Sequence, residues 1–378
     1  MDNLFALHVT YCRHNFGSVL QAFAIKEFLE KLGVKLILVR EDYSQIERIA
    51  FSISRRADFF KKSIMYPEIK TERDAQVKAN SKSIKGISSG SDKAIDAFIA
   101  ENINVADLSY KKMKKYADAD NCQFCIAGSD QIWNGSRVYL NPIYFLSFAP
   151  RRKRIALAPS FGGDTIRNYN SKSYKDYISI FEKLSARERT GVKLISDLCG
   201  KDAKWILDPV LLLTSEEWAK LEKSNTLQVP DEYIFAFFLN EPNEKAAAYL
   251  KNCSAAGKPV FTLGYESNLA ELGIPIHVAD GGPGDFLYLI RNAAQICTDS
   301  FHATVFSMIF HKSFYTFERR YINSDQSTRL TDFLTEAGLI NRYESPSFEY
   351  GGLNAGEFDR FDRIVETNRE DVAQYLSL

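Results

Sequence analysis

A histidine lies where an apolar strand pattern gives way to a helical one, in the string TDSFH at residues 298–302. A helix that begins here presents free backbone N–H groups and the positive end of its dipole, and both favour an anion. His302 could therefore donate a hydrogen bond to a phosphate or transfer a proton near neutral pH. The alternative is a histidine that only caps the helix, and the pattern alone leaves both interpretations open.

A second polar string, GSDQIWN at residues 128–134, follows directly after an apolar run at residues 124–127. It brings Asp130, Gln131 and further hydrogen-bonding groups to one end of a predicted strand. One interpretation is a turn whose side chains cap the next helix. The large ring of Trp133 favours another interpretation, a surface for a sugar or for a second domain.

Other patterns with known chemistry are weak or missing. The loop from Asn15 to Ser18 resembles a phosphate cradle only loosely, because it lacks the glycine spacing of dinucleotide and P-loop sites. Cys122 and Cys125 match CxxC, but no second ligand pair follows, so buried thiols are expected there. We predict no metal site.

The elements that must position these strings alternate between strand and helix. Apolar runs at residues 4–9 and 35–39 flank a helical pattern from Ser18 to Leu32, with Ser18 as the expected N-cap and Gly33 just past the end. A similar alternation returns after residue 231. Ligands in open α/β sheets bind beyond the carboxyl ends of strands, which is where both polar strings lie. We predict an α/β fold in which two Rossmann-like domains face each other across a cleft.

We place the N-terminal domain at residues 1–213 and the C-terminal domain at 214–378. Residues 52–120 are rich in lysine, arginine and serine, so we expect exposed helices and loops there. A basic amphipathic surface that faces anionic lipid is the alternative. The stretch from Phe361 onward is predicted to form a helix that packs back on the N-terminal domain.

Composition narrows the class of protein. The chain has 378 residues, of which 45% are hydrophobic and 25% charged, which excludes a disordered chain and a small disulfide scaffold. Lys+Arg and Asp+Glu both number 48, so the whole protein has no electrostatic signature of a nucleic-acid partner. The first residues lack the pattern of a secretory signal, and six cysteines are scattered, so we expect a cytoplasmic protein with reduced thiols.

Seven strings, in order along the chain, resemble the polysaccharide pyruvyl transferase family. They are residues 15–22 (NFGSVLQA), 128–134 (GSDQIWN), 158–162 (APSFG), 186–188 (ARE), 208–212 (DPVLL), 298–306 (TDSFHATVF) and 327–330 (STRL). The resemblance implies a fold similar to B-type glycosyltransferases. It also implies transfer of the enolpyruvyl unit of phosphoenolpyruvate to a sugar, forming a pyruvate ketal in a capsular, exopolysaccharide or cell-wall glycan. Phosphoenolpyruvate is then a donor substrate, and no cofactor is needed.

The resemblance also implies roles for individual residues. His302 is the expected acid/base residue, and Asp130 is the candidate base, with a structural role as its alternative. Arg187, Arg329 and Ser300 are the expected phosphoenolpyruvate-binding residues. The acceptor, often a lipid-pyrophosphate-linked sugar at the inner membrane face, is expected to contact Asn15, Gly17, Gln21, Ser129 and Gln131.

The sequence departs from the family pattern at one place. Many members have an arginine two positions before the histidine, where this chain has Ser300. Arg291, Arg319 or Arg320 could supply the charge instead. Two other functions remain alternatives: a nucleotide-sugar glycosyltransferase that uses the loop at 280–284 (DGGPG), and a non-catalytic scaffold that docks through residues 52–90.

Overall fold

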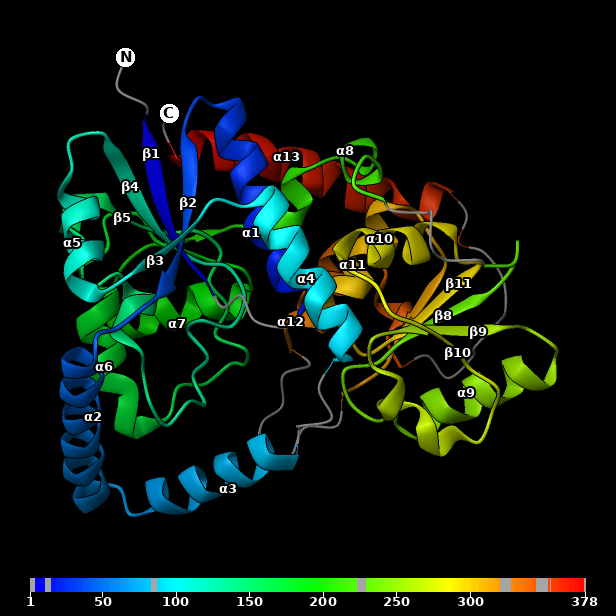
Figure 1. The fold of residues 1–378 in the computed structure, drawn as a ribbon, viewed down its shortest axis with the longest axis horizontal. Coiled ribbons are helices and arrows are strands. Elements are labelled where there is room, and N and C mark those ends of the chain that lie inside the picture. The colour runs from blue at the N-terminus through cyan, green and yellow to red at the C-terminus, as the bar shows by residue number, and fades with distance from the viewer. Residues whose placement is uncertain are drawn as a thin grey trace.

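The computed structural model describes residues 4–10, 15–82, 87–222, 229–319, 328–344, 353 and 355–376. Two parallel sheets organise it, one between residues 5 and 156 and one between residues 234 and 316. Figure 1 shows them on opposite sides of the molecule, with helices around and between them. Within the described ranges, no helix combines the length and apolar character needed to cross a bilayer.

The first sheet has the strand order β3-β2-β1-β4-β5, and all of its pairs are parallel. All five residues of β1 are buried, as expected for a central parallel strand covered on both faces. A bridge from Ile155 to Lys183 leads on to the short β6–β7 pair. The strands are β1 (Phe5–Val9), β2 (Lys35–Glu41), β3 (Val105–Leu108), β4 (Cys122–Ala127), β5 (Arg154–Ala156), β6 (Ser185–Ala186) and β7 (Lys204–Trp205).

The helices of this half are α1 (Phe16–Lys31), α2 (Gln45–Met65), α3 (Glu68–Lys82), α4 (Ser89–Asn102), α5 (Tyr110–Asp118), α6 (Asn168–Ile178), α7 (Arg189–Cys199) and α8 (Ser215–Ala219). The prediction that Ser18 is the N-cap of α1 was wrong. Asn15 caps the helix instead, because its side-chain oxygen accepts hydrogen bonds from the N–H groups of Gly17 and Ser18. Ser18 therefore lies inside α1, and its hydroxyl is available for another partner.

The segment 52–120 is mostly helical, as expected, but it also contains a strand that the sequence analysis missed. β3 extends the first sheet by pairing in parallel with β2, from Leu38↔Val105 to Glu41↔Leu108. Its sequence, VADL, is too short and too polar in the middle to give a strand pattern. A neighbouring strand supplies the hydrogen bonds that decide its structure.

The second sheet has the order β10-β9-β8-β11-β12 and is also parallel throughout. Its strands are β8 (Ile234–Phe237), β9 (Val260–Leu263), β10 (His277–Ala279), β11 (Gln295–Thr298) and β12 (Phe314–Thr316). The accompanying helices are α9 (Glu244–Ala255), α10 (Pro283–Asn292), α11 (Phe301–Ile309), α12 (Thr328–Ala337) and α13 (Asp359–Leu376).

Helix α1 joins the two halves through an apolar core. Phe16 at its start stacks on Phe286 of α10, with ring centroids 5.3 Å apart, and lies against Phe237 of β8. Helix α13 returns to the first sheet, where the Tyr375 hydroxyl donates to the carbonyl oxygen of Ala156 at 2.9 Å. The Phe16 contacts hold the start of α1 against the second half, close to the strand ends where the polar strings lie (Figure 1).

Candidate active site

Asp208, just beyond β7, is the point at which the polar residues of both halves meet. Its Oδ2 accepts a hydrogen bond from Arg187 Nη1 at 2.7 Å and another from the side-chain amide of Gln21. The Nε2 atom of His302 lies 3.6 Å from the same oxygen. Burial opposes ionisation of Asp208, but the nearby His302 and Arg187 side chains outweigh this effect and hold the pKa of Asp208 well below the usual range. Asp208 is therefore a buried anion that accepts hydrogen bonds from Arg187 and Gln21 and lies beside His302.

The Arg187 guanidinium is buried, with 2% of the side chain exposed, and only one of its nitrogens is satisfied. Nη1 bonds Asp208, whereas Nε and Nη2 have no hydrogen-bond partner among the described residues. The guanidinium lies over the ring of Phe301, 4.6 Å from its centroid, and the guanidinium of Arg329 lies 5.7 Å from the same centroid. Two buried guanidinium groups at one ring, one with unused N–H donors, suit a carboxylate or phosphate ligand.

Asp130, at the end of β4, completes the charged group. Its Oδ2 accepts from the Ser18 hydroxyl at 2.5 Å, and its Oδ1 accepts from the backbone N–H of Gln131 at 2.8 Å. Burial opposes its ionisation, but nearby Arg187 and His302 leave its pKa below the ordinary value. Both oxygens are already hydrogen bonded, which is typical of a structural or electrostatic role. The assignment of Asp130 as the base stays a prediction.

Glu188 was not among the expected site residues, although it belongs to the ARE string. Its Oε1 accepts from the Ser160 hydroxyl at 3.0 Å and from the N–H of Phe161 at 2.6 Å, so it anchors the APSFG turn. Its Oε2 lies 4.0 Å from Arg187 Nε. Burial raises the pKa of Glu188, which makes its proton easier to retain than that of an exposed glutamate.

His302 lies in the first turn of α11, as predicted, and packs directly against α1. A Cβ atom on Gly17 would lie 2.1 Å from both Cγ and Nδ1 of the His302 ring. Only glycine allows the helix backbone to approach the imidazole so closely. Gly17, predicted as an acceptor residue, thus positions His302.

We expect Gly17→Ala to lower the free energy of unfolding by about 1–3 kcal/mol, because the added methyl group overpacks the buried imidazole. Urea denaturation measures the change. In a double-mutant cycle, the same substitution in a His302→Ala background should cost at least 1 kcal/mol less, since the ring is gone. Gly356→Ala, where the nearest atom is 4.0 Å from the added Cβ, is the matched control. Equal costs in both backgrounds would contradict the contact.

The other predicted acceptor residues are mostly committed to internal contacts. Gln21 and Ser129 are completely buried; the Ser129 hydroxyl donates to the Ala158 carbonyl oxygen at 2.9 Å. Gln131 accepts from the side-chain amide of Asn134 at 2.7 Å, and Asn15 caps α1. In this conformation, Gln21 and Ser129 lie beneath the site and support Asp208.

The interpretation of Trp133 as a sugar-binding or interface ring was wrong. The side chain is completely buried, stacks on Phe145 with centroids 5.6 Å apart, and donates its indole N–H to the Tyr144 carbonyl oxygen at 2.9 Å. The indole N–H, the polar atom that favours a surface position for tryptophan, thus has a backbone partner inside the core. The GSDQIWN string combines a site residue with a core anchor.

Ser300 is the N-cap of α11, where its Oγ accepts from the N–H of Ala303. Of the arginines considered in its place, Arg291 pairs with Glu222 at 3.1 Å. Arg319 is adjacent to Ser300, because its Nη2 donates to the Asp299 carbonyl oxygen at 2.9 Å. Arg320, like Ser327 of the STRL string, lies outside the described residues.

The space beside Arg187 is small in this conformation. The cavity that Arg187 and Asp208 share with Phe301 and Arg329 has room for about one water molecule. α12 supplies one wall, and the Arg189 Nε atom donates to Glu336 of α12 across its rim at 2.6 Å. A larger ligand requires α12 to move away from β7.

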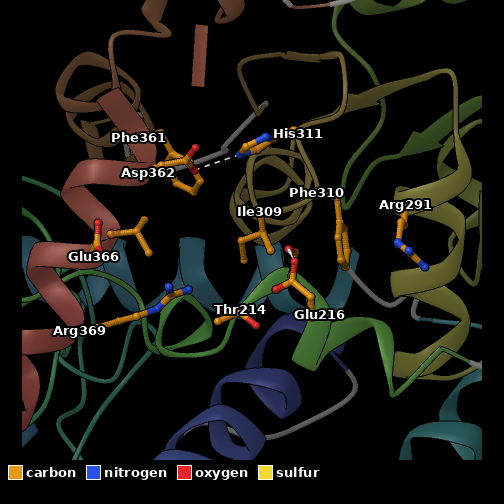
Figure 2. Close-up of a pocket in the computed structure, with 12 residues that line it drawn as sticks. Thr214, Glu216, Arg291, Ile309, Phe310, His311, Phe361, Asp362, Glu366 and Arg369 are labelled. Atoms are coloured by element: carbon orange, nitrogen blue, oxygen red, sulfur yellow. Dashed lines mark hydrogen bonds and ion pairs between the residues drawn. The ribbon is translucent and has the colours of Figure 1, made fainter. Parts of the chain in front are cut away.

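A hollow of about 470 Å³ lies elsewhere, between α13 and the ends of α10 and α11. Figure 2 shows that His311 points to Asp362, and these two side chains are 3.0 Å apart. Arg369, on the same wall, donates to the carbonyl oxygens of Leu211 and Leu213 at 2.8 Å each. The hollow shares no residue with the Arg187 cavity, and its principal cations are already paired, so we place the site at Arg187.

The described residues contain no group of three or more His, Cys, Asp or Glu side chains that could hold a metal ion. The five cysteines within the described ranges are all free, and Cys122 and Cys125 are buried, as expected.

The comparisons with known proteins agree with the fold and the motifs. A family described as polysaccharide pyruvyl transferase matches residues 15–321, and no curated protein matches. UDP-N-acetylglucosamine 2-epimerase from Rickettsia bellii has a similar structure, with 11% identity over 99% of this chain and 96% of that one, and a TM-score of 0.51. The UDP-GlcNAc 2-epimerase from Neisseria meningitidis, bound to UDP-GlcNAc, has 12% identity over 99% of each chain and a TM-score of 0.49. The first likeness confirms the predicted fold of the B-type glycosyltransferase kind, and at these identities it shows the fold alone.

Proposed function

Because this chain belongs to the polysaccharide pyruvyl transferase family, we propose that it transfers the enolpyruvyl group of phosphoenolpyruvate to a sugar. The acceptor is a polysaccharide or its lipid-pyrophosphate-linked precursor, and the product is a pyruvate ketal of a capsular, exopolysaccharide or cell-wall glycan. The proposal places the reaction in the cytoplasm, at or near the inner membrane face. It involves no cofactor, metal or nucleic acid.

The observation that carries this proposal is the unsatisfied Arg187 fork. Nε and Nη2 of a guanidinium that is 2% exposed have no hydrogen-bond partner among the described residues, and the buried Arg329 guanidinium lies beside the same Phe301 ring. Unpaired buried N–H donors are costly, so a site that retains them is suited to a ligand that accepts from them. Phosphoenolpyruvate has a carboxylate and a phosphate, the two groups that a planar arginine fork binds best.

The proposed chemistry begins with a proton transfer to the methylene carbon of phosphoenolpyruvate, which leaves an oxocarbenium-like carbon beside the carboxylate. One sugar hydroxyl attacks that carbon and loses its proton. The C–O bond to phosphate then breaks, phosphate leaves with the bonding electrons, and the second hydroxyl closes the ketal and gives its proton to the departing phosphate. His302 is the proposed proton donor, which recovers a proton from an attacking hydroxyl. The carboxylate of Asp208 lies 3.6 Å from Nε2 of this imidazole, so it is the nearest anion to the proposed proton donor.

Substrate binding in this scheme needs a conformational step. The cavity beside Arg187 is smaller than phosphoenolpyruvate, and α12 closes it through the Arg189–Glu336 pair. This pair is partly exposed, and exposed ion pairs contribute little to stability. We therefore expect α12 to open for the donor and to close over it, which would exclude water from the oxocarbenium-like carbon.

The second candidate, a nucleotide-sugar glycosyltransferase, is less well supported. It would use the loop at residues 280–284, but α4 from the first half covers this loop. The Ser88 hydroxyl donates to Asp280, and the N–H of Gly281 donates to the Ser91 hydroxyl at 3.1 Å. Gly282 packs so closely on Ala94 that an added Cβ would lie 3.2 Å from its carbonyl oxygen. A nucleotide would have to displace α4 to reach the loop.

Calorimetric titration of the full chain with phosphoenolpyruvate and, separately, with UDP-GlcNAc tests the two candidates. We expect saturable binding of phosphoenolpyruvate and none of UDP-GlcNAc. Inorganic phosphate should compete for the site, since it satisfies the same guanidinium groups. Binding of UDP-GlcNAc in the absence of any phosphoenolpyruvate binding would contradict the proposal and favour the glycosyltransferase.

A further inference from the structure

Helix α2 has an apolar face that no described element covers. Its inner face packs on the first half of the molecule: Phe51 lies 4.9 Å from Tyr43 and 6.0 Å from Tyr110, and Phe59 lies 5.7 Å from Tyr139, between ring centroids. The opposite face holds five large apolar side chains, which we call the outer stripe. They are Ile46, Ile49, Ile53, Phe60 and Ile64, with 80%, 60%, 62%, 69% and 68% of their surface exposed.

The spacing of the outer stripe is helical. Its members are separated by three, four, seven and four residues, which places them along one side of an α-helix. Figure 1 shows α2 at the outer edge of the molecule, away from the second half. Single exposed apolar residues are ordinary, but a continuous stripe of them marks a surface that another apolar phase covers.

The charged residues beside the outer stripe indicate which kind of surface covers it. At 100° per residue, Arg56 lies along one edge of the stripe and Lys61 along the other, and neither has an ion-pair partner among the described residues. α2 has five basic residues (Arg48, Arg55, Arg56, Lys61, Lys62) and two acidic ones (Glu47, Asp58), a net charge of +3. The two acidic groups already have partners within this helix and its cap, since Asp58 pairs with Lys62 at 2.7 Å and Glu47 accepts from the backbone N–H of the N-cap Ser44.

We propose that the outer stripe of α2 lies in the interface of an anionic lipid bilayer, with Arg56 and Lys61 at the headgroups. An apolar face bordered by cations is the arrangement of helices that lie flat in this interface. A second copy of the chain fits less well, because two helices of charge +3 would meet with Arg56 and Lys61 at the seam. For the segment 52–120, this proposal adopts the lipid-facing alternative and assigns the lipid-facing surface to α2.

This inference assigns a surface to the membrane contact in the proposed function, and its biological purpose rests on that proposed function. The physical argument uses α2 alone and none of the residues around Arg187. A binding assay with vesicles needs no turnover, so its failure and a failure of phosphoenolpyruvate binding are distinguishable.

The test is co-sedimentation of the full chain with vesicles of phosphatidylcholine, and with vesicles of equal parts phosphatidylcholine and phosphatidylglycerol. We expect binding to the anionic vesicles that weakens with added salt. Arg56→Gln and Lys61→Gln should each reduce the partition coefficient about fivefold. The double variant Ile53→Glu/Phe60→Glu should reduce it at least tenfold, because it removes apolar contact and adds negative charge.

Ile340→Glu is the matched control, since Ile340 is an exposed apolar residue of the second half, and it should bind vesicles as the unaltered chain does. Circular dichroism and thermal unfolding show that each variant is folded. Absence of binding to anionic vesicles, or unchanged binding by Ile53→Glu/Phe60→Glu, would overturn the proposal. A dimer in sedimentation equilibrium that this double variant converts to a monomer, without vesicle binding, would assign the stripe to a second copy.

Discussion

Replacing Arg187 by lysine should weaken phosphoenolpyruvate binding at least 100-fold, about 2.7 kcal/mol, as measured by calorimetry. Lysine keeps the positive charge beside Asp208 but loses the planar fork whose Nε and Nη2 are unused. Two charge-assisted hydrogen bonds to the ligand, each contributing about 1.5–3 kcal/mol, account for a loss of this size. Lysine is preferable to alanine, because removing the cation from the buried pair with Asp208 would cost about 3–5 kcal/mol of stability.

Arg40→Lys is the matched control for this experiment. Arg40 also pairs with an aspartate, Asp107, through two hydrogen bonds, but its side chain is 66% exposed near the carboxyl end of β2. We expect its variant to bind phosphoenolpyruvate as the unaltered chain does. Arg187→Lys with unchanged affinity would remove the anion site from Arg187, and an equal loss in both variants would indicate a general effect of charge.

Replacing His302 by glutamine should lower the rate of phosphate release from phosphoenolpyruvate about 10²–10⁴-fold, the usual contribution of a general acid–base residue. Single-turnover phosphate release, with an acceptor identified by screening free and lipid-linked sugars, measures it. The affinity for phosphoenolpyruvate should change much less than in Arg187→Lys. Glutamine fills similar space against Gly17 and can hydrogen bond Asp208, but it cannot transfer the proton.

His311→Gln is the control for the histidine experiment. His311 follows the same helix at its other end, pairs with Asp362 and lines the hollow of Figure 2, which shares no residue with the Arg187 cavity. Its variant should release phosphate at the unaltered rate. A His302→Gln variant that reacts at full speed would limit His302 to a capping role, the alternative that its sequence position left open.

The order of elements could be predicted because it depends on local patterns. Apolar runs of strand length, and helical spacing between them, indicated the α/β alternation. Gly33 indicated the end of α1, and in the structure this glycine has a φ of +79°, as expected just past a helix. Local patterns failed where a residue's structure depends on elements that are close in space but distant in sequence. β3 is a strand because β2 lies beside it, and Trp133 is buried because Phe145 and the Tyr144 carbonyl oxygen accommodate it.

The candidate site divides in the same way. The sequence by itself placed His302 in the first turn of a helix and, through the family strings, singled out Arg187 and Arg329 as anion ligands. Only the tertiary structure decided that Asp208 joins them, since its partner Gln21 lies 187 positions away in the chain. It also decided that Gly17 faces the His302 ring and that Gln21 and Ser129 are buried. Secondary structure depends largely on neighbouring residues, so the sequence predicts it. A charged cluster forms only when packing brings distant strand ends together and excludes water from them.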